Sequence, residues 1–349
     1  MEVGFATPLK NPLENYCRLH PLKNHPTMNL SSRSVLLLSV LLSVALTCCA
    51  STGNFASNPT NESATGLEIL KQQIFLDSKN FGPGIIDAQL GEFTSKAMAN
   101  YRESMGFAAN WVPNTSGISG YSTYRITSSD FDTLGQNASE PEEQANQTRM
   151  PYTSIIEMLA ERFHTTPNFL RKINSRINVD SAVAGTTISV PAVSRPFSYQ
   201  NYPSSYPAPP ALVASSRHVT VDLREKILKI HEDGRLIAAF PITPGSTEHP
   251  APVGEWRILG SVPFPWYRYD LGVLKKGERT EVFYNLPPGP NNPVGILWAG
   301  LNRPGIGIHG TPVPDTIGRS GSHGCIRLSN WDAATFHTLV GKGTKVSIL

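Results

Sequence analysis

Residues 305–330 read GIGIHGTPVPDTIGRSGSHGCIRLSN, and the interpretation of the whole chain starts from this stretch. It contains His309, His323 and Cys325. A nucleophilic cysteine needs a base nearby and hydrogen-bond donors for the oxyanion that it creates. His309 precedes Cys325 by 16 residues, so a loop can bring its imidazole to the sulfur. If residues 323–325 are extended, the side chains of His323 and Cys325 lie on one face, and Gly324 lets the backbone approach a substrate.

The residue types alone leave two other interpretations open. A lone cysteine is often an inert, buried small hydrophobe, and a neighbouring histidine is often only a polar neighbour. Two histidines and a cysteine also match a catalytic zinc site with three protein ligands. The spacing by itself does not exclude zinc.

The full string from His309 to Asn330 resembles the catalytic domain of the L,D-transpeptidases. The matching positions are His309, Gly310, Thr311, Gly318, Ser320, Gly321, Ser322, His323, Gly324, Cys325, Ile326, Arg327, Leu328 and Asn330. Asp332, after Trp331, also fits. The resemblance spans about residues 217–349 and implies a mainly β sandwich.

The resemblance also implies a cell-wall reaction. Family members attack the bond after the third residue of a peptidoglycan stem tetrapeptide, release D-alanine and form a thioester on the cysteine. An amine of a neighbouring stem then gives a 3→3 crosslink, whereas some members attach a lipoprotein or accept water. The expected partners are therefore peptidoglycan stem peptides and glycan, with no cofactor and no metal.

The same resemblance assigns the site residues. Cys325 is the nucleophile and His309 the general base, while His323 places the substrate or stabilises the thiolate. The amides of Gly324 and Cys325 are expected oxyanion donors. A protonated histidine lowers the pKa of a thiol from about 8.5, which predicts a thiolate at neutral pH.

Two further residues, Ser322 and Arg327, are expected to shape the loop and to contact the substrate carboxylate. Arg327 has an equally weighted structural alternative, in which it pairs with Asp332 or the chain end. Three other functions compete with transpeptidation: an L,D-carboxypeptidase, a zinc peptidase and a non-catalytic wall-binding scaffold. The intact Cys325 and His309 argue against the scaffold.

The catalytic domain is expected to be rich in strands. VTVDL and ILKIHE alternate apolar and polar residues, Asp233-Gly234 predicts a turn, and LIAAFPIT predicts the next strand. Further strands are expected at 253–260, 281–285, 294–299 and 344–349, and a helix at 330–340.

Three segments precede this domain. Residues 66–106 resemble a small three-helix peptidoglycan-binding domain, with a plain helical hairpin as the alternative and Thr94 as an expected helix N-cap. Residues 122–193 follow the order strand, helix, helix, strand and resemble a divergent LysM glycan-binding module with a long insertion. Residues 194–216 are rich in proline and are expected to form an extended, solvated linker.

The amino terminus predicts export. Residues 34–47 read SVLLLSVLLSVALT, which is shorter than a membrane span, and Arg33 supplies the positive flank of a signal peptide. Residues 1–50 are therefore interpreted as an export segment whose true start is expected at Met28. In the following LTCCAS, Cys49 fits a lipidation site that would anchor the protein to a membrane, and cleavage after Ala50 is the alternative. The expected location is the periplasm or cell envelope.

Composition excludes other classes of protein. The 349 residues include 28 Gly and 29 Pro, which argues against an all-helical protein or a coiled coil. The formal net charge is only +3, and no long basic run occurs, so the sequence gives no support for nucleic-acid binding.

Overall fold

The computed structural model describes residues 63–349 except 247–248, 277 and 320–323. The predictions for the export segment 1–50, for the start at Met28 and for lipidation at Cys49 lie outside the described residues, as do those for Ser322 and His323. Across the part of the chain that the structure describes, no helix has the length and apolar character needed to cross a membrane.

The described chain begins with a pair of helices, α1 (Ala64–Ser78) and α2 (Glu92–Met105). Ser63 caps α1 by accepting a hydrogen bond from the Gly66 amide at 3.0 Å. The prediction that Thr94 caps α2 is wrong, because α2 begins two residues earlier after Gly91. Thr94 is buried instead and accepts a hydrogen bond from the Gln73 side chain. Residues 63–106 form these two helices rather than the three that the family resemblance implies.

The next part contains the elements expected for residues 122–193. Strand β1 (Tyr121–Arg125) pairs antiparallel with β2 (Thr187–Pro191). The helices between them are α3 (Ser128–Phe131), α4 (Pro141–Ala145), α5 (Ile155–Arg162), α6 (Pro167–Ile173) and the 3-10 turn η2 (Val179–Ser181). Leu159, Leu170 and Ile188 are fully buried in a hydrophobic core to which Leu70 and Ile74 of α1 also belong. Glycan binding by this part stays a prediction.

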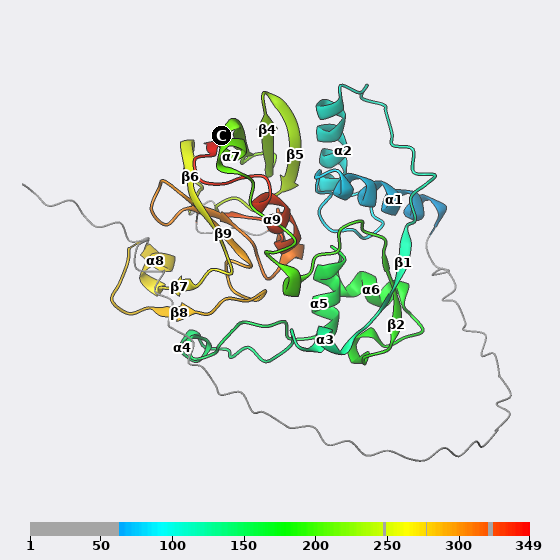
Figure 1. Ribbon diagram of the computed structural model, residues 1–349, viewed down its shortest axis with the longest axis horizontal. Helices are drawn as coiled ribbons and strands as arrows, with labels where there is room; N and C mark the ends of the chain where they lie inside the picture. The colour runs from blue at the N-terminus through cyan, green and yellow to red at the C-terminus, as the bar shows by residue number, and fades with distance from the viewer. Residues whose placement is uncertain (1–62, 247–248, 277, 320–323) are drawn as a thin grey trace, which may run out of the picture. The chain divides into compact units, whose positions relative to one another are not determined.

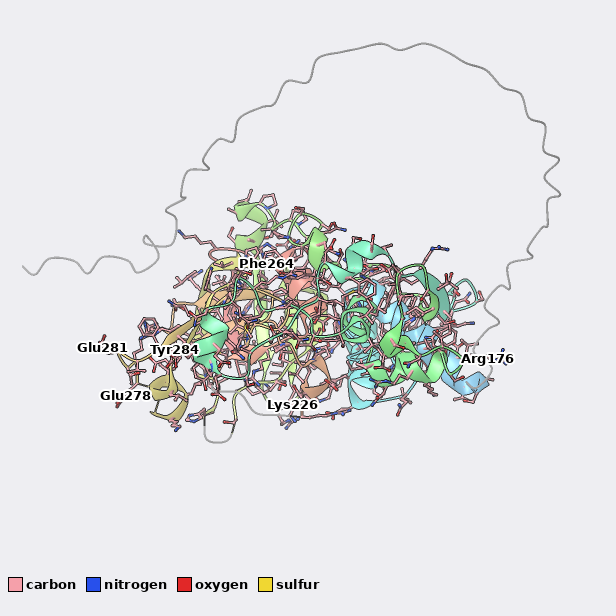
Figure 2. The ribbon with its side chains drawn as sticks, turned by 90° about the horizontal axis from the view of Figure 1, so that it is seen from below. Arg176, Lys226, Phe264, Glu278, Glu281 and Tyr284 are labelled. Carbon is pink, nitrogen blue, oxygen red and sulfur yellow. The ribbon has the colours of Figure 1, made fainter. Side chains whose placement is uncertain are left out.

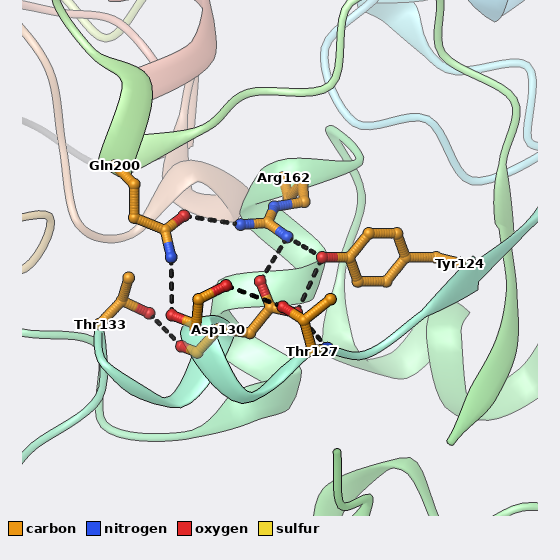
Figure 3. A network of polar contacts seen from close by, with 7 residues as sticks. Tyr124, Thr127, Asp130, Thr133, Arg162 and Gln200 are labelled. Atoms are coloured by element: carbon orange, nitrogen blue, oxygen red, sulfur yellow. Dashed lines mark hydrogen bonds and ion pairs between the residues drawn. The ribbon is translucent and has the colours of Figure 1, made fainter. Parts of the chain in front are cut away.

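A polar network around a buried ion pair connects this part to the segment that follows it (Figure 3). The Arg162 guanidinium lies 2.7 Å from Asp130 Oδ1 and donates to the Gln200 side chain at 3.0 Å. The Tyr124 hydroxyl donates to the second oxygen of Asp130 at 2.8 Å. Through these contacts, β1, α3, α5 and the 3-10 turn η3 (Tyr199–Asn201) are joined at one point.

The expectation of a solvated linker at residues 194–216 is wrong. Phe197, Tyr202 and Tyr206 are at most 8% exposed and belong to the core of the C-terminal domain. The segment ends in helix α7 (Ala211–Ser216). Burial of three aromatic rings outweighs the tendency of a proline-rich chain to stay extended in water.

The C-terminal domain is built on one sheet (Figure 1). Its strands are β3 (Arg217–Asp222), β4 (Ile227–Glu232), β5 (Arg235–Pro241), β6 (Gly254–Pro263), β9 (Leu297–Leu301), β10 (Gly307–His309), β11 (Ile326–Arg327) and β12 (Lys345–Ile348). Their order across the sheet is β11-β10-β9-β6-β12-β3-β4-β5. The pairs β10–β11 and β12–β3 are parallel, and the others are antiparallel.

This sheet curls until its two edges meet. The first half of β6 pairs with β12 and its second half with β9, with a register shift between Ile258 and Gly260. Thr243, just after β5, exchanges two backbone hydrogen bonds of 2.9 and 3.0 Å with Arg327 in β11. The expected β sandwich is therefore corrected to a single eight-stranded sheet whose edges are bridged at Thr243 and Arg327.

A hairpin and a helix complete the domain. Strands β7 (Tyr267–Tyr269) and β8 (Tyr284–Leu286) pair antiparallel, and helix α8 (Leu271–Lys276) lies between them in sequence. Glu278 and Glu281, between α8 and β8, lie at the opposite end of the described part from Arg176 (Figure 2). The predicted C-terminal helix is present as α9 (Asn330–His337), capped by Ser329.

Candidate active site

The register of two short parallel strands brings the catalytic residue types together. Ile308 in β10 pairs with Ile326 in β11, and both side chains are fully buried in the core. Side chains alternate between the two faces of a strand. His309 therefore projects from the opposite face, together with Arg327 beside it and Cys325 just before β11.

One hydrogen bond orients the His309 imidazole. Its Nδ1 lies 2.7 Å from the Gly310 carbonyl oxygen, which can only accept. Nδ1 therefore carries the proton, and Nε2 presents its lone pair. The side chain is 4% exposed, and burial lowers the pKa of His309 to about 4. Near neutral pH, the ring is a neutral base with a defined tautomer.

The indole of Trp298 forms a wall beside this imidazole. Trp298 in β9 pairs with His309, and the two rings stack with centroids 5.6 Å apart. A methyl group on Gly307 would lie 2.7 Å from the indole, and one on Gly300 would lie 3.0 Å from it. Glycine at both positions lets the indole lie flat against the strands.

The Cys325 thiol is partly exposed and lies 3.4 Å from the Gly305 carbonyl oxygen, to which it donates. Burial raises the pKa of Cys325, whereas a backbone hydrogen bond from Gly307 and the positive charge of Arg327 act in the opposite direction. Gly324, immediately before it, has a φ of +91°, a conformation that favours glycine.

These pKa directions change the expected charge state of the site. The sequence predicted a thiolate stabilised by a protonated histidine. Burial instead favours the neutral form of both groups, because it raises the pKa of the Cys325 thiol and lowers that of His309. Burial therefore favours a neutral thiol at Cys325 and a neutral imidazole at His309.

Arg327 and Tyr267 complete the charged surroundings of the sulfur. Burial raises the pKa of Tyr267 to about 12, and the charge of Cys325 acts on it in the same direction. Burial lowers the pKa of Arg327, and Cys325 and Tyr267 oppose that shift. Asp332, offered by the sequence as a partner of Arg327, instead accepts a hydrogen bond from Ser329 at 2.8 Å. The guanidinium therefore belongs to the thiol site.

Sequence reasoning missed Trp298 and Tyr267 as members of the site. Trp298 faces His309 because of the β9–β10 register, and a sequence does not show that register. The glycines at 300 and 307 are the signal that could have indicated a large side chain lying across neighbouring strands. Tyr267 comes from a three-residue strand that is too short to give an alternating pattern.

A zinc site was one of the alternative interpretations of these residues. Among the residues that the structure describes, His, Cys, Asp and Glu side chains form no group of three or more that could hold a metal ion.

Known proteins are similar to the same part of the chain. Residues 216–348 match the model of the L,D-transpeptidase catalytic domain. The chain is 28% identical over 193 residues to the putative L,D-transpeptidase YkuD of Bacillus licheniformis, a match that covers 55% of this chain and 92% of the relative. It is 40% identical over 75 residues to the probable L,D-transpeptidase ErfK/SrfK of Escherichia coli, covering 22% of this chain and 23% of the relative.

Solved structures of the same class also match. An L,D-transpeptidase from Mycobacterium smegmatis matches at 21% identity and a TM-score of 0.32, covering 38% of this chain and 58% of that chain. The catalytic domain of the Enterococcus faecium L,D-transpeptidase matches at 20% identity and a TM-score of 0.29, covering 39% of this chain and 98% of that domain. The chain thus spans little more than half of the mycobacterial protein.

The family model and the curated relatives agree with the resemblance of the motif around Cys325. Residues 216–348 are an L,D-transpeptidase catalytic domain.

Proposed function

We propose that the protein is a peptidoglycan L,D-transpeptidase in which Cys325 is the nucleophile and His309 the general base. The observation that supports this most directly is the shared face of β10 and β11. The Cys325 thiol and the His309 imidazole project from this face, and the Gly310 carbonyl accepts a hydrogen bond from Nδ1, so that Nε2 is available as the base.

The first half of the reaction follows from these positions. The thiol attacks the carbonyl carbon of the third residue of a stem tetrapeptide, and His309 Nε2 takes the thiol proton. The amides of Gly324 and Cys325 donate to the oxyanion. As the bond to D-alanine breaks, the imidazolium returns the proton to the leaving amine, and a thioester remains on Cys325.

The second half reverses the proton transfers. An amine of a neighbouring stem attacks the thioester and loses a proton to His309, and the thiol is regenerated when the C–S bond breaks. The product is a 3→3 crosslink. Arg327 and Tyr267 border the thiol, and the Arg327 guanidinium is suited to a substrate carboxylate. The roles proposed for His323 and Ser322 rest on the motif alone.

The surrounding protein serves this reaction at the cell wall. The helices of residues 66–106 and the LysM-like part would raise the local concentration of substrate if they bind glycan. We further propose export to the periplasm or cell envelope, with Cys49 as the lipid-anchoring residue.

Mass spectrometry of products tests the reaction. The chain from residue 51 onward, which includes every described residue, is incubated with a disaccharide-tetrapeptide, with Cys325→Ala as the control. Dimers that have lost one D-alanine, formed only by the unchanged protein, support transpeptidation. Tripeptide monomers alone indicate L,D-carboxypeptidation, or attachment to an absent acceptor such as a lipoprotein amine. Product formed by Cys325→Ala contradicts the mechanism.

A further inference from the structure

A buried carboxylate outside the catalytic domain reaches the back of the catalytic site. Glu161 lies in α5 of the LysM-like part and is 5% exposed. Its Oε2 accepts a hydrogen bond of 2.9 Å from the side-chain amide of Asn330, the first residue of α9. Its Oε1 accepts from the hydroxyl of the buried Tyr152. Both oxygens of this carboxyl group are therefore satisfied inside the protein.

Asn330 connects this carboxylate to the strands that hold the base. Its Oδ1 accepts a hydrogen bond of 3.2 Å from the Ile296 amide, next to β9. The same oxygen fills the space beside two glycines: a methyl group on Gly295 would lie 2.2 Å from it, and one on Gly310 would lie 2.3 Å from it. Asn330 has no exposed surface.

Gly310 is the residue whose carbonyl oxygen orients His309. A shift of Asn330 therefore acts on the peptide group that fixes the imidazole tautomer. A small displacement of a positioned catalytic group has a large effect on rate. Because the amide of Asn330 is held by Glu161 on one side and by the Pro290 carbonyl at 3.2 Å on the other, its orientation depends on both contacts.

We propose that Glu161 is a positioning residue for the catalytic base: it fixes Asn330, Asn330 fixes Gly310, and Gly310 fixes the tautomer of His309. The LysM-like part is then a structural component of the active site in addition to any role in glycan binding. This proposal rests on the assignment of His309 as the base.

Two substitutions of Glu161 distinguish the effect of its hydrogen bond to Asn330 from the effect of its side-chain volume. Glu161→Gln keeps an acceptor for Asn330, and its new amide can donate to the Tyr152 oxygen. Burial raises the pKa of Glu161 to about 8, so a neutral amide also resembles its charge state near pH 7. Glu161→Leu introduces an apolar side chain of similar size and leaves the Asn330 amide without this acceptor.

A matched control breaks another hydrogen bond between the same two parts of the chain. The Asn291 side chain donates to the Pro151 carbonyl at 2.8 Å and is not part of the path from Glu161 to Gly310. Asn291→Ala therefore loosens the contact between the parts, whereas the groups that bond the Asn330 side chain, from Glu161, Ile296 and Pro290, are not removed. All variants are compared at a temperature at which each is folded by circular dichroism.

The readout is the titration of the His309 ring, followed by NMR on protein with ¹⁵N-labelled histidine. The chain from residue 51 onward is used, and His309→Ala identifies the signal. The unchanged protein, Glu161→Gln and Asn291→Ala are expected to show the Nδ1-protonated tautomer and a pKa near the value of about 4 that burial imposes. Glu161→Leu is expected to lose the single tautomer and to titrate at a lower pH than the unchanged protein, because the hydrogen bond to the Gly310 carbonyl raises the pKa of His309 and is no longer held in place.

Turnover of a disaccharide-tetrapeptide gives a second readout. Glu161→Leu is expected to lower kcat roughly tenfold with little change in KM, since the substrate groove is not altered. A His309 titration in Glu161→Leu that matches the unchanged protein overturns the positioning proposal, as does an equal shift in Asn291→Ala or equal damage in Glu161→Gln. NMR shifts as expected in a protein that has no turnover would contradict the proposed reaction and leave the positioning role supported.

Discussion

Two opposite pKa shifts define the chemistry of the site at the level of single residues. Burial raises the pKa of the Cys325 thiol and lowers that of the His309 imidazole, so the charged pair is disfavoured on both sides. The Cys325 thiol and the His309 imidazole are therefore both neutral near neutral pH. In the proposed reaction, the proton moves from sulfur to Nε2 as the new bond forms.

This charge state predicts how Cys325 responds to pH. Only the thiolate reacts with iodoacetamide at a useful rate, and a raised thiol pKa reduces the thiolate fraction at pH 7–8. The alkylation rate is expected to keep rising beyond pH 9, the ordinary titration range of cysteine. Rates from about pH 6 to pH 10, measured beside a small-molecule thiol, test this. An alkylation rate that reaches a plateau by pH 7 contradicts the raised pKa and supports a thiolate stabilised by a protonated histidine.

The packing of Trp298 predicts that one methyl group added at Gly307 lowers both stability and turnover. In Gly307→Ala, the new Cβ would lie 2.7 Å from the indole, so the ring must move away from His309. We expect a loss of about 1–3 kcal/mol in the free energy of unfolding together with reduced turnover. Gly260→Ala is the control, because no atom lies within 4 Å of the position that its methyl group would take. Equal stability and turnover in the two variants would contradict the role given to Trp298.

The sequence identified the reactive residue types but not all of their neighbours. Cys325 and His309 stand in a motif with fixed spacing, and the curled sheet brings them to one face. Trp298 and Tyr267 enter the site through strand register and through a short hairpin strand. Glu161 reaches it through a contact between residues 169 positions apart. Local sequence patterns contain no information about such pairings.

At the level of elements, the sequence did not predict the short strands of the site or the burial of the proline-rich segment. Strands β10 and β11 are three and two residues long, too short for an alternating pattern, although they hold the site. The longer strands β3, β4 and β5 were predicted because alternation and the turn at Asp233-Gly234 are strong signals. Residues 194–216 contain five prolines, which predict a linker, but aromatic residues among the prolines are buried and hold the segment to the domain.

The burial of this segment predicts that it stabilises the catalytic domain. Phe197 is 1% exposed and packs in the core of the curled sheet, so Phe197→Ala is expected to cost about 3–5 kcal/mol of unfolding free energy. Leu212→Ala, in the same segment at 83% exposure, is expected to change it by less than about 0.5 kcal/mol. Denaturant unfolding checks both. If Phe197→Ala were as stable as Leu212→Ala, residues 194–216 would be a solvated linker, as the sequence predicted.

At the level of the whole molecule, contacts between its parts contain buried acids. Burial raises the pKa of Glu161 to about 8 and that of Asp332 to about 7. Near Asp332, the His164 ring stacks on Trp331 with centroids 5.2 Å apart and its Nδ1 lies 2.9 Å from Asp77. Contacts among the helices α1 and α2, residues 122–193 and the catalytic domain therefore include buried ionisable side chains.

These acids predict a loss of stability as the pH rises. A carboxyl group whose pKa is higher in the folded protein stabilises the fold below its unfolded pKa, and this contribution is lost as the pH rises through the folded pKa. His309 has the opposite shift, and its contribution is complete by about pH 6.5. Between about pH 6.5 and 8.5, the unfolding free energy is therefore expected to fall.

Denaturant unfolding at these two pH values measures the effect. The double variant Glu161→Gln, Asp332→Asn should show a smaller fall, because neither replaced side chain titrates in this range. A pH dependence unchanged from that of the original protein would mean that other groups are responsible.

Acylation of Cys325 by the stem peptide is the step on which the proposed function depends. Intact-mass spectrometry after brief incubation with a tetrapeptide stem and rapid acid quenching detects it. We expect a tripeptide acyl adduct, mapped to Cys325 by digestion, released by hydroxylamine as a thioester and absent from Cys325→Ala. Product formation with no such adduct, or an adduct on any other residue, would show that Cys325 is not the nucleophile.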